Sequence, residues 1–82
     1  MNKNEMKNQV RIILASMDSQ LEIYNRIFED TDNDQILDDL ESLTASLACL
    51  IQEDFDDSPV YVFNEAFVLL DTFNNLTIKL DA

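Results

Sequence analysis

The sequence contains no glycine, no histidine and no tryptophan, and it has a single proline and a single cysteine. Without glycine, phosphate-cradling loops and turns that need a positive φ must be built without the residue best suited to them. Without histidine, the chain lacks the usual general base near pH 7 and the commonest transition-metal ligand. Zinc sites of the Cys/His kind and Ser-His or Cys-His nucleophile pairs are therefore excluded within one chain.

The single cysteine, Cys49, cannot form an intramolecular disulfide, which is typical of a reducing compartment. The first nine residues are polar and do not resemble a signal peptide. No apolar run approaches the roughly 20 residues that span a bilayer. We therefore expect a cytoplasmic protein. Cys49 lies among small and apolar neighbours, and we expect it to be a buried apolar side chain rather than a reactive thiol.

The length of 82 residues predicts one domain, residues 1–82, and the 46% of hydrophobic residues argues against disorder despite the charge. Apolar residues recur at steps of three and four in three segments, which predicts an all-α fold. The expected architecture is a small three-helix bundle, or a helical hairpin plus a third helix. The helices are expected at about 4–28, 34–52 and 58–79.

Two helix starts carry recognisable signals. Ser58 followed by Pro59 is typical of an N-cap and the first helical position, where the missing N–H of proline costs nothing. Asp32 or Asp34 is expected to cap the second helix, because a short carboxylate can accept its free N–H groups.

The third predicted helix is apolar over most of its circumference. Its β-branched and aromatic start, residues 60–63, could form a short strand, but the pattern continues at helical spacing and favours a helix. A thin bundle cannot cover so much apolar surface, so we expect a homo-oligomer, such as a homodimer. The residues expected at its interface are Val60, Phe63, Phe67, Leu70 and Phe73.

The net charge of −12 is unevenly distributed. Between Ile27 and Ile78 there are thirteen acids and no Lys or Arg. Direct binding to nucleic acid or to anionic membranes is disfavoured, because five bases cannot outweigh seventeen acids near a polyanion. A surface of one sign favours a basic partner, such as the nucleic-acid-binding surface of another protein. The alternative is that the charge only keeps the protein soluble.

The acids expected to contact such a partner lie on the second helix and in the segments beside it. They are Asp30, Asp32, Asp34, Asp38, Asp39, Glu41, Glu53, Asp54, Asp56 and Asp57.

Residues 30–41 resemble an EF-hand calcium loop, with acids at its positions 1, 3, 5, 9 and 12. The resemblance implies Asp30, Asp32, Asp34, Asp38 and Glu41 as ligands. It fails at the sixth position, where Gln35 replaces the glycine of the sharp turn. We therefore favour a capped helix start and expect no metal and no cofactor.

Three short helices enclose little volume in which carboxylates could become catalytic, so we do not expect an enzyme. In size, charge and asparagine content the chain is similar to the small acidic helical proteins of phages, plasmids and toxin–immunity systems. That resemblance implies a stoichiometric inhibitor or immunity-type protein that covers a basic surface of its partner. The alternatives are a structural or adaptor subunit that assembles through its third helix and, third, a calcium-binding protein.

Overall fold

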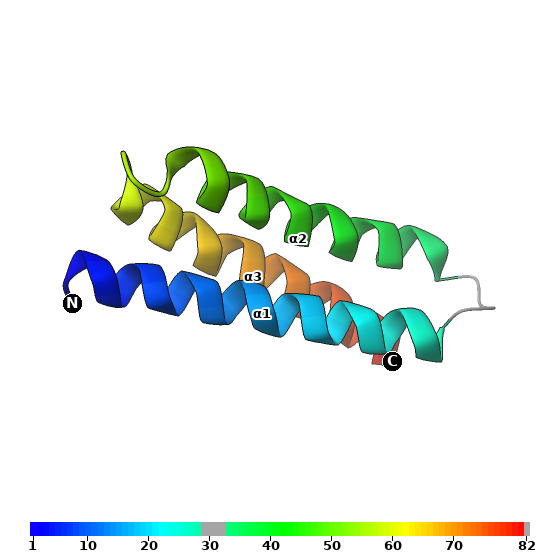
Figure 1. Ribbon diagram of the computed structural model, residues 1–82. Helices are drawn as coiled ribbons and strands as arrows, with labels where there is room; N and C mark the ends of the chain where they lie inside the picture. Colours follow the sequence, from blue (N-terminus) through cyan, green and yellow to red (C-terminus); the bar gives the residue numbers. More distant parts are fainter. Residues whose placement is uncertain (29–32, 82) are drawn as a thin grey trace.

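A computed structural model of the protein describes residues 1–28 and 33–81. These residues form three α-helices, and no strand occurs among them (Figure 1). The predicted all-α fold is confirmed, and residues 60–63 are helical. The helix ends differ from the expected ones by no more than two residues. The helices are α1 (Lys3–Ile27), α2 (Asp34–Asp54) and α3 (Pro59–Asp81).

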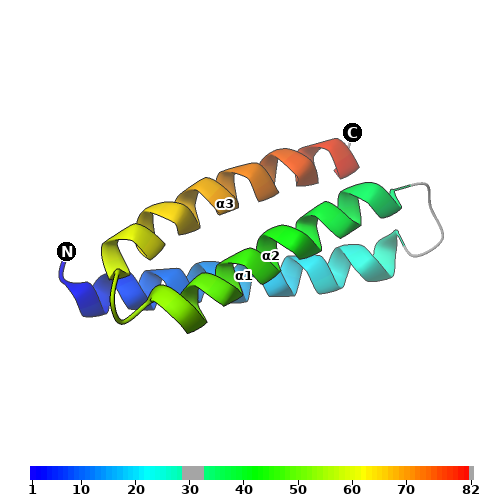
Figure 2. The same cartoon turned by 90° about the horizontal axis from the view of Figure 1, so that it is seen from above.

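The three helices lie side by side in an up-down-up order. α1 and α3 run in the same direction and α2 runs against both, so that the two termini lie at opposite ends (Figures 1 and 2). The Cα atoms extend over 42 × 20 × 16 Å. The long dimension matches the length of α1 at about 1.5 Å per residue. Among the described residues, no helix combines the length and the apolar character needed to cross a bilayer.

The three helix starts are capped in different ways. At α1, the side chain of Asn2 accepts the backbone N–H of Glu5 at 2.9 Å. At α3, Pro59 is the first helical residue, and the carbonyl of Ser58 accepts the N–H of Val62 at 3.1 Å. α2 begins at Asp34 itself, so Asn33 holds the cap position and the prediction that Asp34 caps this helix is wrong. Asp32 lies outside the described residues.

The turn from α2 to α3 is made without any left-handed residue. Phe55 keeps helical dihedral angles, with φ −64° and ψ −41°, and the N–H of Ser58 donates to the carbonyl of Asp54 at 2.8 Å. No described residue has a positive φ. The lack of glycine therefore carries no strain in the part of the chain that the structure describes.

One narrow core runs between the three helices, and α3 contacts both α1 and α2. Two threonines, Thr44 and Thr77, are buried in it. Their hydroxyls donate to the carbonyls of Leu40 at 2.9 Å and Asn74 at 2.8 Å, so each polar group is satisfied within its own helix. The buried apolar residues are Val10, Ile13, Met17, Leu37, Leu40, Leu47, Phe55, Val62, Ala66, Phe73 and Leu80.

The rotation of α2 about its own axis decides which of its side chains are buried. Its buried row is centred on Leu40, Thr44 and Leu47, and this turns Ala48 and Cys49 to the surface. The prediction that Cys49 is buried is therefore wrong. The apolar neighbours of Cys49 in sequence suggested burial, but most of them lie on other sides of the helix.

Phe73 tests whether the core holds the fold. Its side chain is 0% exposed, whereas that of Phe67, six residues earlier on the same helix, is 46% exposed. We expect Phe73→Ala to destabilise the chain by about 3–5 kcal/mol and Phe73→Leu by on the order of 1 kcal/mol. The matched change Phe67→Ala should cost only on the order of 1 kcal/mol in dilute protein, mainly through the lost edge-to-face contact with Phe63. Urea denaturation followed by circular dichroism measures all three, and equal losses for Phe67→Ala and Phe73→Ala would contradict this core.

Candidate functional site

The charges are segregated by helix. α1 carries four bases and three acids, whereas α2 carries six acids and no base. The acids of α2 are Asp34, Asp38, Asp39, Glu41, Glu53 and Asp54. α2 is therefore the most negative helix of the bundle, and it is the element on which a basic partner would be held.

Three of the four bases of α1 are engaged within the chain. Lys7 lies 3.2 Å from a carboxylate oxygen of Asp56, and its ammonium lies 5.3 Å from the ring centroid of Phe55. The guanidinium of Arg11, one turn along α1, lies 5.0 Å from the same ring. Arg26 pairs with Glu22. Lys7 and Arg11 therefore lie at the α2–α3 turn, while Arg26 pairs within α1 and lines the same hollow as Asp34, the first acid of α2.

The predicted acidic face is divided into two groups. Asp34, Asp38 and Glu41 follow one another at steps of four and three, so they lie on one side of α2, and all three are exposed. Asp39 is half-buried beside them, and one of its carboxylate oxygens accepts a hydrogen bond from Nε2 of Gln35 at 3.0 Å. The remaining acids expected at this end, Asp30 and Asp32, lie outside the described residues.

The second group lies at the other end of α2, and Glu53 is about 18 Å from Glu41 at 1.5 Å per residue. Glu53 and Asp54 end the helix, and Asp56 and Asp57 follow in the turn. The side chain of Asp56 is 98% exposed, yet it pairs with Lys7. The charges at this end of α2 are therefore of both signs, because Lys7 of α1 lies beside Asp56. Around Asp38, every charged side chain on α2 is an acid.

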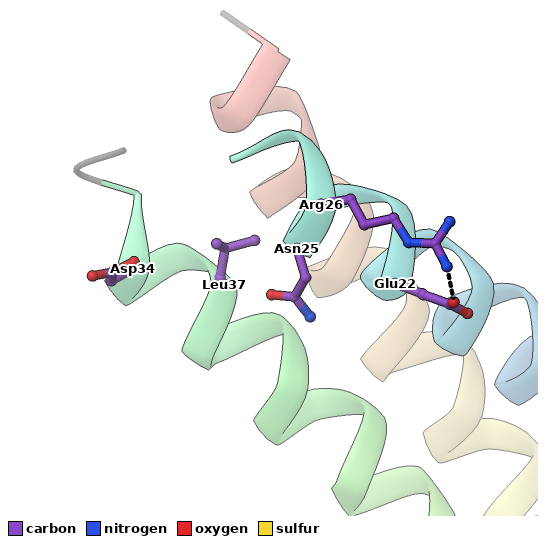
Figure 3. Close-up of a pocket in the computed structure, with 5 residues that line it drawn as sticks. All are labelled: Glu22, Asn25, Arg26, Asp34 and Leu37. Atoms are coloured by element: carbon purple, nitrogen blue, oxygen red, sulfur yellow. Dashed lines mark hydrogen bonds and ion pairs between the residues drawn. The ribbon is translucent and has the colours of Figure 1, made fainter. Parts of the chain in front are cut away.

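A shallow hollow of about 460 Å³ lies where the end of α1 meets the start of α2 (Figure 3). It is lined by Glu22, Asn25, Arg26, Asp34 and Leu37. Arg26 donates to Glu22 at 2.6 Å, and the carboxylate of Asp34 points away from that pair (Figure 3). Because these polar groups do not converge on one point, we assign no ligand to the hollow.

The calcium-loop resemblance does not fit the backbone. Its positions 5 to 12, Asp34 to Glu41, form the first two turns of a regular helix rather than a loop that wraps an ion. Asp34 and Glu41 are separated by about 10 Å along the axis of that helix. Among the described residues, no three Asp, Glu or Cys side chains lie close enough together to hold a metal ion.

The predicted oligomer interface is also divided. Phe73 is buried in the core of its own chain, while Phe63 and Leu70 are half-buried. Val60 and Phe67 are exposed, and the rings of Phe63 and Phe67 meet edge to face with centroids 5.0 Å apart. The surface that a second chain could reach is therefore Val60 and Phe67, with Phe63 and Leu70 at its edge.

A groove between α2 and α3 was missed by the sequence reasoning. Small side chains recur at helical spacing on α2, with Ser42 four residues before Ser46 and Ala45 four residues before Cys49. That spacing was a signal for it, because small side chains on one helix face leave room for a neighbouring element.

The chain matches no known protein family, and no curated protein or solved structure is significantly similar to it.

Calcium binding can be tested with magnesium as a matched control. We expect circular dichroism and the melting temperature to respond equally to calcium and magnesium, because any divalent ion screens a chain of charge −12. A chelator should leave the helical spectrum unchanged. A rise in melting temperature with sub-millimolar calcium, and not with magnesium, would revive the EF-hand interpretation.

Proposed function

We propose that this chain is a non-catalytic, cytoplasmic binding protein whose α2 acids contact a basic surface on a partner protein. The observation that carries the proposal is the segregation of charge. α2 has six acids and no base, while Lys7, Arg11 and Arg26 are engaged elsewhere by their own chain. A surface meant only for solubility usually mixes both signs, which limits self-repulsion. A field of one sign instead steers and holds a partner of opposite charge.

The spacing of the acids supports a nucleic-acid-binding surface as the target. Asp34, Asp38 and Glu41 place about one charge per 5 Å of helix axis, against one phosphate per about 3.4 Å along a DNA strand. The exposed side of α2 thus approaches the charge density that such a surface is built to accept. A protein that occupies it would act as a stoichiometric inhibitor or immunity-type protein, of the kind found in phages and plasmids.

The test compares two triple variants that remove the same charge from different helices. Asp34→Asn, Asp38→Asn and Glu41→Gln neutralise the exposed side of α2, and Glu5→Gln, Asp18→Asn and Glu22→Gln neutralise α1. Exposed charges contribute roughly 0.2–1 kcal/mol each. We therefore expect the α2 variant to lose about threefold to a hundredfold in affinity for a partner captured from the native host. The α1 variant should bind like wild type, and circular dichroism should show both folded.

Salt and nucleic acid give the second readout. The wild-type complex should weaken with rising salt, and the α2 variant should depend on salt less. Nucleic acid should compete for the captured partner. Equal binding by wild type and the α2 variant at low salt would show that the α2 acids do not contact the partner, and the proposal would be wrong.

A second candidate function is favoured by the apolar surface of α3: a structural or adaptor subunit that self-assembles. The chain exposes 5300 Å², close to the about 5000 Å² of a compact monomer of its mass, so one chain alone closes a bundle. Even so, α3 keeps large apolar side chains at the surface. They are Val60, Tyr61, Phe67, Val68 and Ile78.

Light scattering at tens of micromolar tests this assembly. Val60, Phe67 and Ile78 are seven and eleven residues apart, so they lie on one side of α3. We expect wild type to be a homodimer and Phe67→Ser to be a monomer. Val68→Ser removes a similarly exposed apolar side chain from a different side of α3 and should leave the dimer intact. A monomeric wild-type protein would contradict the assembly and assign the apolar surface to another partner.

A further inference from the structure

A groove runs along the seam between α2 and α3. It consists of two adjoining hollows of about 410 and 320 Å³ that share Ser46. Its floor is formed by leucines from both helices, which are half-buried in the chain alone: Leu43, Leu50, Leu69 and Leu76. The apolar floor reaches into both hollows, so that one elongated occupant could cover both.

The walls of the groove are low and less polar than their sequence suggests. On α2 they are made by small side chains, among them Ala45 and Cys49, which are exposed. The hydroxyl of Ser46 donates to its own helix at the carbonyl of Ser42, at 2.8 Å. On α3 the hydroxyl of Thr72 likewise donates to the carbonyl of Val68, at 3.1 Å. Because both O–H donors are used within their helices, these hydroxyls offer an occupant only acceptor lone pairs and the carbons beside them.

Acids border the groove at both ends. Glu53 and Glu65 line one hollow and Asp39 lines the other, and none of the described residues that line them is a base. From Asp39 to Glu53 the groove follows α2 for about 21 Å, the length of a helix of about 14 residues. On α3, exposed Tyr61 and Val68 lie one turn before Glu65 and Thr72 and extend the same wall with apolar surface.

We propose that this groove binds an amphipathic helix of about 14 residues from the partner, with an apolar stripe flanked by Lys and Arg. The inference rests on the proposed function and adds a second contact with the same partner, because Asp39, Glu53 and Glu65 border the groove while Asp34, Asp38 and Glu41 lie on another side of α2. The stripe covers the leucine floor, the flanking bases pair with Asp39, Glu53 and Glu65, and the bound helix completes a four-helix arrangement.

Charge complementarity selects this occupant over a second copy of the chain. A second copy would bring a net charge of −12 against these same acids. Like charges placed opposite one another across an interface cost free energy, whereas a lysine-flanked stripe satisfies the apolar floor and the acidic border together.

The position of Cys49 provides a direct test, since it is the only thiol in the chain and it lines the groove. The probe is a synthetic peptide of about 14 residues with leucines at helical spacing and lysines on both flanks. At saturation we expect it to slow the reaction of Cys49 with a small thiol reagent at least about tenfold. A peptide with glutamates in place of the lysines, and one of scrambled order, should not protect the thiol.

Two variants make the site assignment specific. In Cys49→Ser with Ser19→Cys the thiol moves to the exposed side of α1, and the lysine peptide should leave its reaction rate unchanged. Ala45→Phe fills the groove from an exposed position on α2 and should abolish protection, whereas Ala15→Phe on α1 should not. Glu53→Gln with Glu65→Gln should lower the affinity for the lysine peptide by about twofold to thirtyfold.

The outcomes separate this inference from the proposed function. Failure of the lysine peptide to protect Cys49, equal protection of Cys49 and the α1 thiol, or equal protection by the glutamate peptide would overturn the groove assignment. If Ala45→Phe binds the captured partner like wild type while the α2 acid variant does not, the proposed function stands and the groove inference fails. If the groove binds the peptide but neutralising the α2 acids leaves partner binding unchanged, the proposed function fails while the groove remains a site for a basic amphipathic helix.

Discussion

The narrow cross-section of the bundle, 20 by 16 Å, limits each helix to about one row of fully buried side chains. α3 exceeds this limit most, because it is apolar on nearly every side. Val62, Ala66, Phe73 and Leu80 take the buried row, and the other large apolar side chains of α3 are half-buried or exposed, with Leu69 and Leu76 lining the seam with α2. Within the described residues, no buried side-chain polar atom lacks a hydrogen bond. The apolar surface follows from the small number of helices, because three helices cannot cover every apolar side of α3.

The small number of bases limits how the charges can be arranged, as the small number of helices limits the core. Self-repulsion among the acids opposes folding, and five bases must offset it as well as they can. Lys7 and Arg11 lie one turn apart on α1 and close over Phe55, and Lys7 also reaches Asp56. These contacts hold the turn between α2 and α3, which has no glycine to shape it. α2 has six acids and no base in its own sequence, and Lys7 and Arg11 lie at the turn rather than along this helix.

The helices could be predicted because each apolar stripe is long and because Ser58 and Pro59 mark a clear start. The rotation of α2 could not, since its stripe is broad and the buried polar Thr44 lies at its centre rather than at its edge. Because the rotation of α2 could not be fixed from the sequence, the prediction that Cys49 lies in the core was wrong. The helix bounds expected from the sequence leave Phe55 in a linking segment, although an aromatic residue among four acids is a sign of burial. The groove needs the relative placement of two helices, which one periodic pattern does not contain.

Two apolar surfaces of α3 point in different directions, and this bears on which partner each one takes. Phe67 lies two residues before Leu69, which is a rotation of about 200° around the helix. Leu69 lines the groove beside the α2 acids, so Phe67 faces away from it. A second copy that approached along Phe67 would keep the two six-acid helices apart, whereas a basic helix is favoured in the groove. Self-association and partner binding would therefore use different sides of α3, and one molecule could do both at once.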